Sequence, residues 1–420
     1  MPDVVVVGAG PAGLAAARRA VECGASVTMV DDNPAAGGQI WRAAGGRLRR
    51  ETERWLARAE LITGARVFAA PAPGRLALET LQGEMEIAYR SLVLATGARE
   101  RFLPFPGWTL PNVMGAGGLQ ALAKSGLPVE RKKVVVAGCG PLLLAVAEYL
   151  RDHGANVRLV AEQASRSSLL RFGLGLAGRP GKLIQAAGFR AGLLGVRYFT
   201  SCWPMAAEGS EKLERVIMRR GNRTWSESCD YLACGFGLIP NVELPALLGC
   251  RLGAKGVAVD EFQQTSVAGV YCAGEVTGIG GLELSLVEGE IAGYAAAGGL
   301  EAARKLFGAR ESRRRFADGL ERAFAPREEL KTLAADDTLV CRCEDVTWAR
   351  VRRFTGWREA KLHTRCGMGP CQGRVCGGAV EFLLGWKPGS VRPPVFPVRV
   401  GSLAGAVPSP QCGEKPGDIR

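Results

Sequence analysis

The chain has 420 residues, a length that suits two or three domains. Hydrophobic residues at 47% and charged residues at 23% are typical of a soluble globular protein and exclude a disordered, collagen-like or coiled-coil chain. The net charge is +13, and basic residues gather at 47–50 and 313–315. Because no nucleic-acid-binding motif accompanies them, we expect a solvated surface or an acidic partner and no nucleic acid.

The sequence contains no run of 18 apolar residues, and it enters an apolar strand directly after Met1, Pro2 and Asp3. We therefore expect a cytoplasmic protein without a transmembrane segment. Of the 13 cysteines, five lie between residues 341 and 376. In an intracellular chain this clustering predicts a metal or redox site in place of disulfides.

A buried-type strand, a glycine turn and an Ala/Leu-rich helix open the chain. Gly8 allows the tight turn, Gly10 lets a pyrophosphate approach the backbone, and Gly13 lets the helix pack on the strand. The next strand, residues 26–30, leads to Asp31, which can accept the hydroxyls of a ribose. This order of elements predicts a dinucleotide site.

The same pattern returns after a strand at residues 133–137. Gly138 and Gly140 form the second turn, but Leu143 stands where a third glycine would allow close packing, so this motif is weaker. Glu162 follows the next strand and is available for a ribose. We expect an adenine nucleotide here; the alternative is a nucleotide-binding fold that is retained as a scaffold.

Two more strands complete the pattern: residues 92–98 contain an Ala-Thr-Gly turn, and residues 269–275 end on an acid. Residues 1–300 thus resemble the flavoproteins related to glutathione and thioredoxin reductases. The resemblance implies an α/β fold with two dinucleotide-binding domains, one for FAD and one for NAD(P). The implied FAD contacts are Gly8, Gly10, Pro11, Ala12, Gly13, Asp31, Asp32, Gly38, Gln39, Thr96, Gly97, Gly274 and Glu275; the implied NAD(P) contacts are Gly138, Gly140 and Glu162. Glu275 stands where the family usually has Asp.

The cysteine pair of the disulfide reductases is missing. Residues 1–130 contain only Cys23, residues 37–42 (GGQIWR) stand in place of the pair, and the second nucleotide domain has no C-x-x-C. The two histidines, His153 and His363, lie in ordinary helix or linker patterns. Dithiol and hydrolase chemistry are therefore not expected, and the sequence identifies no catalytic residue.

The C-terminal cysteines follow a C-x-C and a later C-x4-C pattern, which favours a 2Fe-2S cluster over a zinc ribbon. The motifs C-R-C-E and G-M-G-P-C-Q-G-R-V-C resemble the 2Fe-2S domain of bacterioferritin-associated ferredoxin (BFD) and anaerobic glycerol-3-phosphate dehydrogenase. The resemblance implies the ligands Cys341, Cys343, Cys371 and Cys376. Cys366 is the rival for the place of Cys376.

Nearly the whole chain resembles the α subunits of heteromeric amino-acid-oxidising flavoenzymes: opine, D-hydroxyproline and L-proline dehydrogenases, hydrogen cyanide synthase and sarcosine oxidase. The resemblance implies a partner β subunit of the D-amino-acid-oxidase type that oxidises a C–N bond on its own FAD. This chain would pass the electrons through flavin and 2Fe-2S to an acceptor that the sequence does not identify. Some members hold FMN between subunits, and such a complex could associate peripherally with a membrane.

Two alternatives remain open from the sequence. One is a self-sufficient NAD(P)H-dependent flavin and iron-sulfur reductase, and the other is a non-enzymatic, redox-sensing assembly module. The expected division of the chain is an FAD domain at 1–126 and 237–300, an NAD(P)-like domain at 127–236, a helical connector at 301–335, a BFD-like 2Fe-2S domain at 336–390 and a Pro-rich tail at 391–420. The prolines of the tail exclude a helix or central strand, so we expect it to lie over a partner or over the domain surface.

Overall fold

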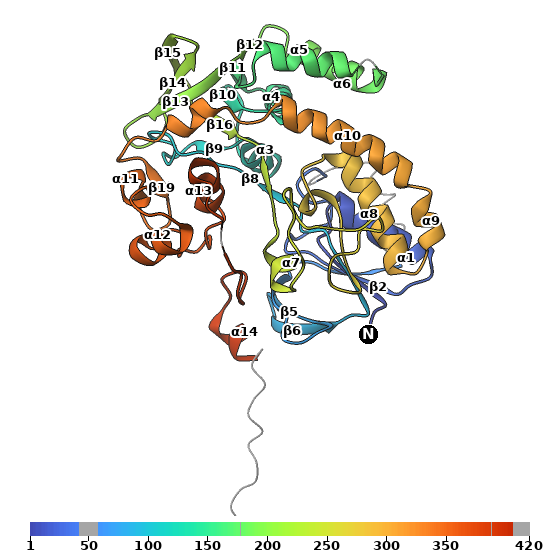
Figure 1. Ribbon diagram of the computed structural model, residues 1–420. Helices are drawn as coiled ribbons and strands as arrows, with labels where there is room; N and C mark the ends of the chain where they lie inside the picture. The colour runs from blue at the N-terminus through green and yellow to red at the C-terminus, as the bar shows by residue number, and fades with distance from the viewer. Residues whose placement is uncertain (42–57, 177, 388, 406–420) are drawn as a thin grey trace, which may run out of the picture.

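The structure is a computed structural model that describes residues 1–41, 58–176, 178–387 and 389–405. The basic segment 47–50 and the end of the tail, residues 406–420, lie outside the described residues. Two sheet-based units and a smaller cysteine-bearing module make up the molecule. In Figure 1 the first unit lies at the lower right, the second at the top and the cysteine module at the left.

The first unit is built on a parallel sheet in the order β18-β7-β1-β2-β3. All four residues of β1 are valines that are at most 8% exposed, as expected for a strand covered on both faces. The strands of this sheet are β1 (Val4–Val7), β2 (Val27–Val30), β3 (Glu60–Ile62), β7 (Ser91–Leu94) and β18 (Val270–Cys272). An antiparallel sheet adds β4 (Arg66–Ala69), β5 (Arg75–Thr80) and β6 (Gly83–Ala88).

Two helices of the first unit pack so closely that glycine is required between them. They are α1 (Pro11–Glu22), which follows the first glycine turn, and α8 (Leu282–Ala296). A Cβ atom on Gly289 would lie 2.1 Å from the carbonyl oxygen of Ala12, and one on Gly293 would lie 2.1 Å from that of Ala16. The short elements η1 (Gly274–Val276) and α7 (Glu243–Leu247) complete the unit.

The second unit repeats the parallel arrangement in the order β12-β11-β10-β16-β9. Its strands are β9 (Val113–Gly115), β10 (Lys133–Gly138), β11 (Asn156–Glu162), β12 (Arg197–Thr200) and β16 (Tyr231–Gly235). Its helices are α3 (Ala116–Lys124), α4 (Leu142–Asp152), α5 (Arg166–Gly175) and α6 (Pro180–Gly192), and an antiparallel sheet adds β13 (Cys202–Glu208), β14 (Arg215–Arg220) and β15 (Arg223–Ser228). Because β9 pairs with β16, this sheet takes in residues that precede the expected boundary at 127.

Two short antiparallel strands, β8 (Ala98–Glu100) and β17 (Leu238–Pro240), carry the chain between the units. The cysteine module packs against this junction. A Cβ on Gly378 would lie 2.0 Å from Cδ1 of Ile239, and the indole Nε1 of Trp108 donates to the Leu339 carbonyl at 2.6 Å. The module consists of β19 (Leu339–Cys341), β20 (Val346–Thr347), α11 (Trp348–Val351), α12 (Trp357–Thr364) and α13 (Cys376–Leu384).

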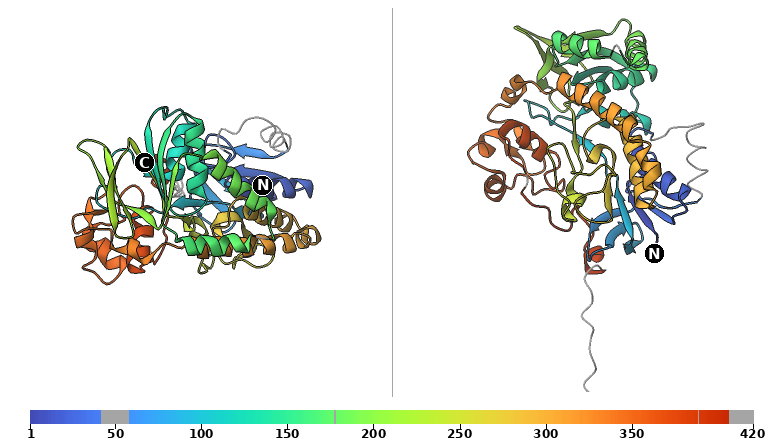
Figure 2. Two further views of the ribbon diagram at one scale, coloured as in Figure 1. Left: turned by 90° about the horizontal axis from the view of Figure 1, so that it is seen from above. Right: turned by 45° about the vertical axis from the view of Figure 1, so that its right-hand side comes forward.

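The connector consists of α9 (Leu300–Arg304), α10 (Phe307–Ala323) and η2 (Glu328–Thr332). Figure 2 shows α10 running between the first and second units. Arg314 of this helix pairs with the buried carboxylate of Glu288 at 2.9 Å and donates to Gln263 at 3.2 Å. The connector is thus fixed to the first unit by an ion pair whose acid is inaccessible to water.

The tail lies over the antiparallel sheet of the first unit, as one of the two expected placements has it. The Val395 N–H donates to the Phe68 carbonyl at 2.8 Å, and Arg399 pairs with Glu79 at 3.1 Å. The expectation that no helix forms here is wrong for α14 (Val400–Gly405). Residues 398–405 contain no proline, so the backbone hydrogen bonds of this short helix can form.

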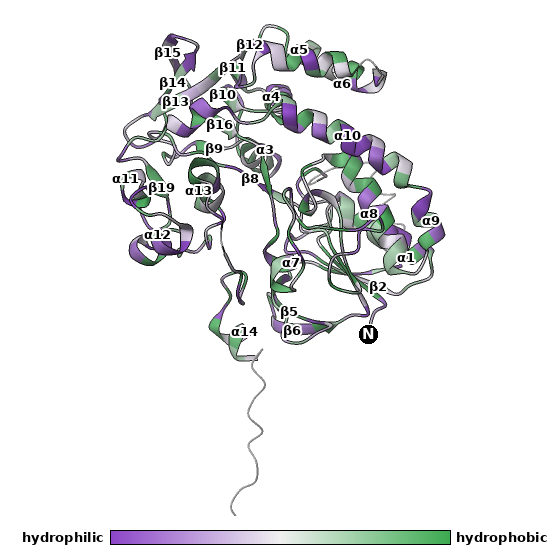
Figure 3. Ribbon diagram, in the orientation of Figure 1, coloured by the Kyte–Doolittle hydropathy of each residue, from purple (hydrophilic) through white to green (hydrophobic). Residues whose placement is uncertain are grey.

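Along the long helices, hydrophobic and hydrophilic residues alternate (Figure 3). In the part of the chain that the structure describes, no helix has both the length and the apolar character that crossing a membrane requires.

Candidate cofactor and metal sites

The first glycine turn forms a cradle. Gly8 has φ of +102°, and a Cβ there would lie 2.2 Å from the Ala95 carbonyl oxygen; a Cβ on Gly13 would lie 1.8 Å from that of Gly8. Among the described residues, a Cβ on Gly10 would meet only the Cα of Gly38, at 3.8 Å. Gly10 is the N-cap residue of α1 and provides no side-chain hydrogen bond to the helix N-terminus, and Pro11 occupies the first helical position. The open space before Gly10 therefore faces a helix N-terminus, which suits a pyrophosphate.

Asp31 is 6% exposed and belongs to this turn. Its Oδ2 accepts from the Ala9 N–H at 2.5 Å, and its Oδ1 accepts from the Asn33 N–H at 2.7 Å. The following residue, Asp32, is exposed and lies 3.5 Å from Arg66, and Gln39 is exposed as well. The structure thus brings Asp31 to the glycine turn and leaves Asp32 and Gln39 accessible.

Thr96 and Gly97 form a turn that is tied to the returning chain. The Thr96 hydroxyl donates to the Asn241 carbonyl at 2.7 Å, and the Asn241 side-chain amide donates to the Thr96 carbonyl at 2.8 Å. Gly97 has φ of +67°, a conformation that favours glycine. This double hydrogen bond fixes the end of β7 to the start of the returning segment.

Gly274 and Glu275 lie over the start of α1. A Cβ on Gly274 would lie 2.7 Å from the Cβ of Ala12, and the Gly274 N–H donates to Glu288 at 3.1 Å. Glu275 accepts from the Gly281 N–H at 3.0 Å, and burial raises the pKa of its carboxyl group. The structure therefore brings the first glycine turn, Asp31 and the distant pair Gly274 and Glu275 together at the N-terminus of α1.

The second glycine turn has a similar backbone. A Cβ on Gly138 would lie 2.0 Å from the Gly235 carbonyl oxygen, whereas the space around Gly140 is open among the described residues. Glu162 is 1% exposed, and its two oxygens accept from the Gly140 and Ala164 N–H groups, each at 2.8 Å. Burial raises the pKa of Glu162 to about 7.

The residue that follows the acidic residue of each glycine turn is exposed in the first unit (Asp32) and buried in the second. In the second unit this residue is Gln163, which is 0% exposed because the end of the connector covers it. Its Nε2 donates to the carbonyls of Phe324 and Ala325 at 3.4 and 3.2 Å, and its Oε1 accepts from the Arg327 N–H at 3.1 Å. Sequence patterns could not reveal this cover, because it joins residues about 160 positions apart.

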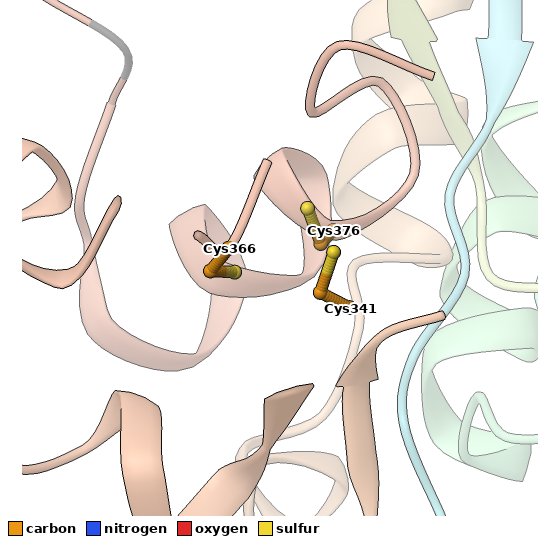
Figure 4. A group of neighbouring side chains, drawn as sticks. All are labelled: Cys341, Cys366 and Cys376. Carbon is orange, nitrogen blue, oxygen red and sulfur yellow. The ribbon is translucent and has the colours of Figure 1, made fainter. Parts of the chain in front are cut away.

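Five cysteines of the module form one connected group. The sulfurs of Cys341, Cys366 and Cys376 lie within 4.8 Å of one another and converge from β19, a loop and the start of α13 (Figure 4). Cys371 hydrogen-bonds with Cys376 and with Cys343. The structure thus brings the four predicted ligands together, and the rival Cys366 belongs to the same group.

A cavity of about 270 Å³ distinguishes among these cysteines. Four of them line it, namely Cys341, Cys343, Cys371 and Cys376, whereas Cys366 does not. The opposite wall comes from the junction of the two units and consists of Phe102, Trp108, Val113, Met114 and Gly115. These residues reach the cysteines only through tertiary contacts, so no local sequence motif could predict that they line the cavity.

The pKa values of these thiols shift in opposite directions: burial raises that of Cys343, and hydrogen bonding to Cys341 raises that of Cys376, whereas those of Cys341 and Cys371 are lowered. Bonds from Cys366 and Cys376, and then from the backbone N–H groups of Gly367 and Glu344, lower the pKa of Cys341 to about 2. A bond from Cys376 is the main cause that lowers the pKa of Cys371 to about 5. Bonding to Cys341 raises the pKa of Cys366 to about 12. Thiolates and inward-facing N–H groups are what metal ions and iron-sulfur clusters require.

The two histidines are engaged in stacking. His153 stacks on Tyr149 with ring centroids 4.0 Å apart, and His363 stacks on Phe354 at 5.3 Å.

Comparison with known proteins places the chain. Residues 2–299 match the family of pyridine nucleotide-disulphide oxidoreductases, and the chain belongs to that family. It is 33% identical to an opine oxidase subunit of Rhizobium meliloti over 96% of this chain and 99% of the relative. It is 30% identical to the hydrogen cyanide synthase subunit HcnB of Pseudomonas aeruginosa over 89% and 90% of the two chains.

Among solved structures, the L-proline dehydrogenase of P. horikoshii superposes with a TM-score of 0.67 at 21% identity, over 96% of this chain and 79% of that chain. The expected α/β fold of the pyridine nucleotide-disulphide oxidoreductases is confirmed, whereas the BFD-like 2Fe-2S domain expected at 336–390 stays a prediction. The predicted group of relatives is confirmed, and the protein is a flavin-dependent oxidoreductase. The opine oxidase and cyanide synthase relatives are subunits of their enzymes.

Proposed function

We propose that this chain is the electron-transfer subunit of a heteromeric, FAD-dependent dehydrogenase that oxidises the C–N bond of an amino or imino acid such as an opine, hydroxyproline, proline or glycine. The observation that carries the proposal is the cavity at the junction of the two units, which four cysteines line. A redox group in this cavity would lie against residues between 102 and 115, which follow β8 in the chain, and Thr96 and Gly97 of the flavin unit directly precede β8.

The proposed FAD site is the first glycine turn. Gly10 and the start of α1 would receive the pyrophosphate, Asp31 together with the exposed Asp32 beside it the adenosine ribose, and Glu275 the ribityl chain. The fit rests on the open space before Gly10, because the other two glycines of the turn are closed by backbone contacts. Gly38, Gln39, Thr96, Gly97 and Gly274 are the further proposed contacts.

The proposed ligands of a 2Fe-2S cluster are Cys341, Cys343, Cys371 and Cys376. The close group of Cys341, Cys366 and Cys376 alone would favour Cys366, but a cluster needs space beside its ligands, and Cys366 does not line the cavity. A flavin accepts electrons in pairs and a 2Fe-2S cluster takes them singly, so the two groups together would convert pair transfer to single-electron transfer. The N–H groups of Gly367 and Glu344 would hydrogen-bond to the Cys341 sulfur and tune the potential.

The second nucleotide site is proposed to be a scaffold or a regulatory adenine-nucleotide site centred on Gly138, Gly140 and Glu162. The connector covers Gln163, the residue beside the ribose-binding acid, and Leu143 fills the position of the third glycine. These features argue against a site where NAD(P)H enters and leaves rapidly. For this reason we propose the electron-transfer function ahead of the NAD(P)H-dependent reductase.

The proposed partner is a β subunit of the D-amino-acid-oxidase type with its own FAD, in a complex that would be cytoplasmic or peripherally associated with a membrane. The support is that the opine oxidase and cyanide synthase relatives, each at 30% identity or more, are subunits. FMN at the subunit interface is part of the proposal. The partner would choose the amino acid.

The experiment compares two reductants under anaerobic conditions. The flavin absorbance of the isolated chain is followed after NADH is added, and that of the co-expressed complex after an amino or imino acid is added. We expect bleaching in the complex with substrate and only slow bleaching by NADH in the isolated chain. Rapid stoichiometric bleaching by NADH would instead establish the self-sufficient reductase. A complex that forms but transfers no electrons would favour the redox-sensing module.

A further inference from the structure

A cavity of about 360 Å³ lies between α5 of the second unit and α10 of the connector, outside the sites described above. Four arginines line it: Arg171 and Arg179 from the α5 side, and Arg315 and Arg322 from α10. No acidic residue of the described chain lines the cavity. Arg315 belongs to the basic segment 313–315, whose neighbour Arg314 is used to hold Glu288.

The four guanidinium groups have few acidic partners in the described structure. Within the described part of the chain, Arg171 and Arg322 form no ion pair, and Arg315 reaches only the exposed Glu311, at 3.9 Å. Arg179 donates to the Ser312 carbonyl at 2.5 Å. The nearby acids of α10 are engaged elsewhere, because Asp318 and Glu321 both pair with Lys255. The described residues therefore leave an excess of positive charge in the cavity.

Two aromatic rings give the same cavity an apolar part. Phe172 and Phe316 line it with centroids 5.9 Å apart, and the guanidinium of Arg179 lies 5.2 Å from the centroid of Phe316. Arginine forks pair with phosphate oxygens through two parallel hydrogen bonds, and aromatic faces accept apolar or ring-shaped groups. A volume of about 360 Å³ is in the range of small-molecule sites.

We propose that this cavity binds a small phosphate-bearing molecule with two or more negative charges and an apolar or aromatic portion. The anion would bridge α5 and α10 and thereby fix the second unit to the connector. The connector also covers Gln163 and inserts Arg314 into the first unit, so a ligand here would stabilise the arrangement of both units. The proposal does not depend on the identity of the substrate or of the redox groups.

The test is isothermal titration of the flavin-loaded full-length chain with inorganic pyrophosphate, ADP and citrate at one fixed ionic strength. The variants are Arg171→Gln and Arg322→Gln, which break no ion pair within the described residues. The matched control is Arg166→Gln, since Arg166 is exposed at the start of the same α5 but does not line the cavity. Flavin content is measured for each protein to show that the first glycine turn is unchanged.

We expect pyrophosphate to bind with 1:1 stoichiometry, ADP to bind more tightly, and either cavity variant to weaken the binding of both by about tenfold or more, whereas ADP bound at the second glycine turn would be unaffected by these variants. The control should change binding by less than about twofold. Equal weakening by all three variants would show general charge attraction and overturn the site. Absence of binding, or citrate binding as tightly as pyrophosphate, would overturn the assignment to phosphate. If ADP binds no more tightly than pyrophosphate, the two rings have no role in binding. If the variants bind phosphate normally but no longer co-purify with a co-expressed partner subunit, the cavity binds an acidic segment of that partner instead.

Discussion

A single methyl group at Gly10 should separate cofactor binding from folding. Gly10 has φ of −75°, a value that alanine adopts freely, and among the described residues a Cβ there would meet only the Cα of Gly38 at 3.8 Å. The entropic gain of Gly10→Ala and the poorer N-capping of alanine nearly cancel, so unfolding of the apoprotein should change by less than about 1 kcal/mol. The methyl group would occupy the space proposed for the pyrophosphate. An overlap of this kind costs about 1–3 kcal/mol, which weakens FAD binding by roughly 5- to 150-fold.

Gly13→Ala is the matched contrast, because a Cβ there would lie 1.8 Å from the Gly8 carbonyl oxygen. Backbone must move to relieve that overlap, so this variant should lose more than about 3 kcal/mol of stability or fail to fold. The assays are flavin absorbance per polypeptide and thermal unfolding of the apoproteins. Full flavin content in Gly10→Ala would show that the pyrophosphate does not approach at this residue. Wild-type stability of Gly13→Ala would refute the packing of the turn.

Three further outcomes follow from the structure. Cys376→Ser should lose iron and the visible charge-transfer bands, and Cys366→Ser should keep both, because of these two cysteines only Cys376 lines the cavity. Iron analysis and absorbance spectra check this, and the reverse pattern would exchange the two roles. Arg314→Met should destabilise the fold by about 2 kcal/mol in denaturant unfolding, because the buried Glu288 keeps its bonds from Gly274 and Thr277 but loses its cation, and a loss below about 0.5 kcal/mol would contradict the ion pair. Burial raises the pKa of Glu162 from 4.5 to about 7, so folding takes up a proton there; this stabilisation is full below pH 4.5 and is lost as the pH rises through about 7. Glu162→Gln should remove that part of the pH dependence, on the order of 3 kcal/mol across the window, and parallel stability curves for the two proteins would refute the shift.

The sequence predicts those parts of the molecule that depend on neighbouring residues. The turns at Gly8 and Gly138 require glycine for local reasons, a positive φ and a close backbone contact, and so both nucleotide-binding units could be recognised from short motifs. The strand of four valines that precedes the first turn follows in the same way from its composition.

Features that depend on distant contacts could not be predicted in this way. Strand β9 joins the second sheet only through its pairing with β16, more than 100 residues later, which is why the expected boundary at 127 falls after it. The cover over Gln163 and the wall that Trp108 contributes to the cysteine cavity are likewise contacts between remote segments. Cysteine spacing alone leaves Cys366 and Cys376 as rivals, because their difference lies in which sulfur faces open space.

The most direct test of the proposed electron path is the EPR spectrum of the co-expressed complex, frozen under anaerobic conditions after its amino or imino acid substrate is added. We expect the signal of one reduced 2Fe-2S cluster per chain, which appears with substrate and is absent from a complex that carries Cys371→Ser. A complex whose flavins are reduced by substrate while no such signal develops, or zinc in place of iron in the anaerobically purified chain, would contradict the proposed path.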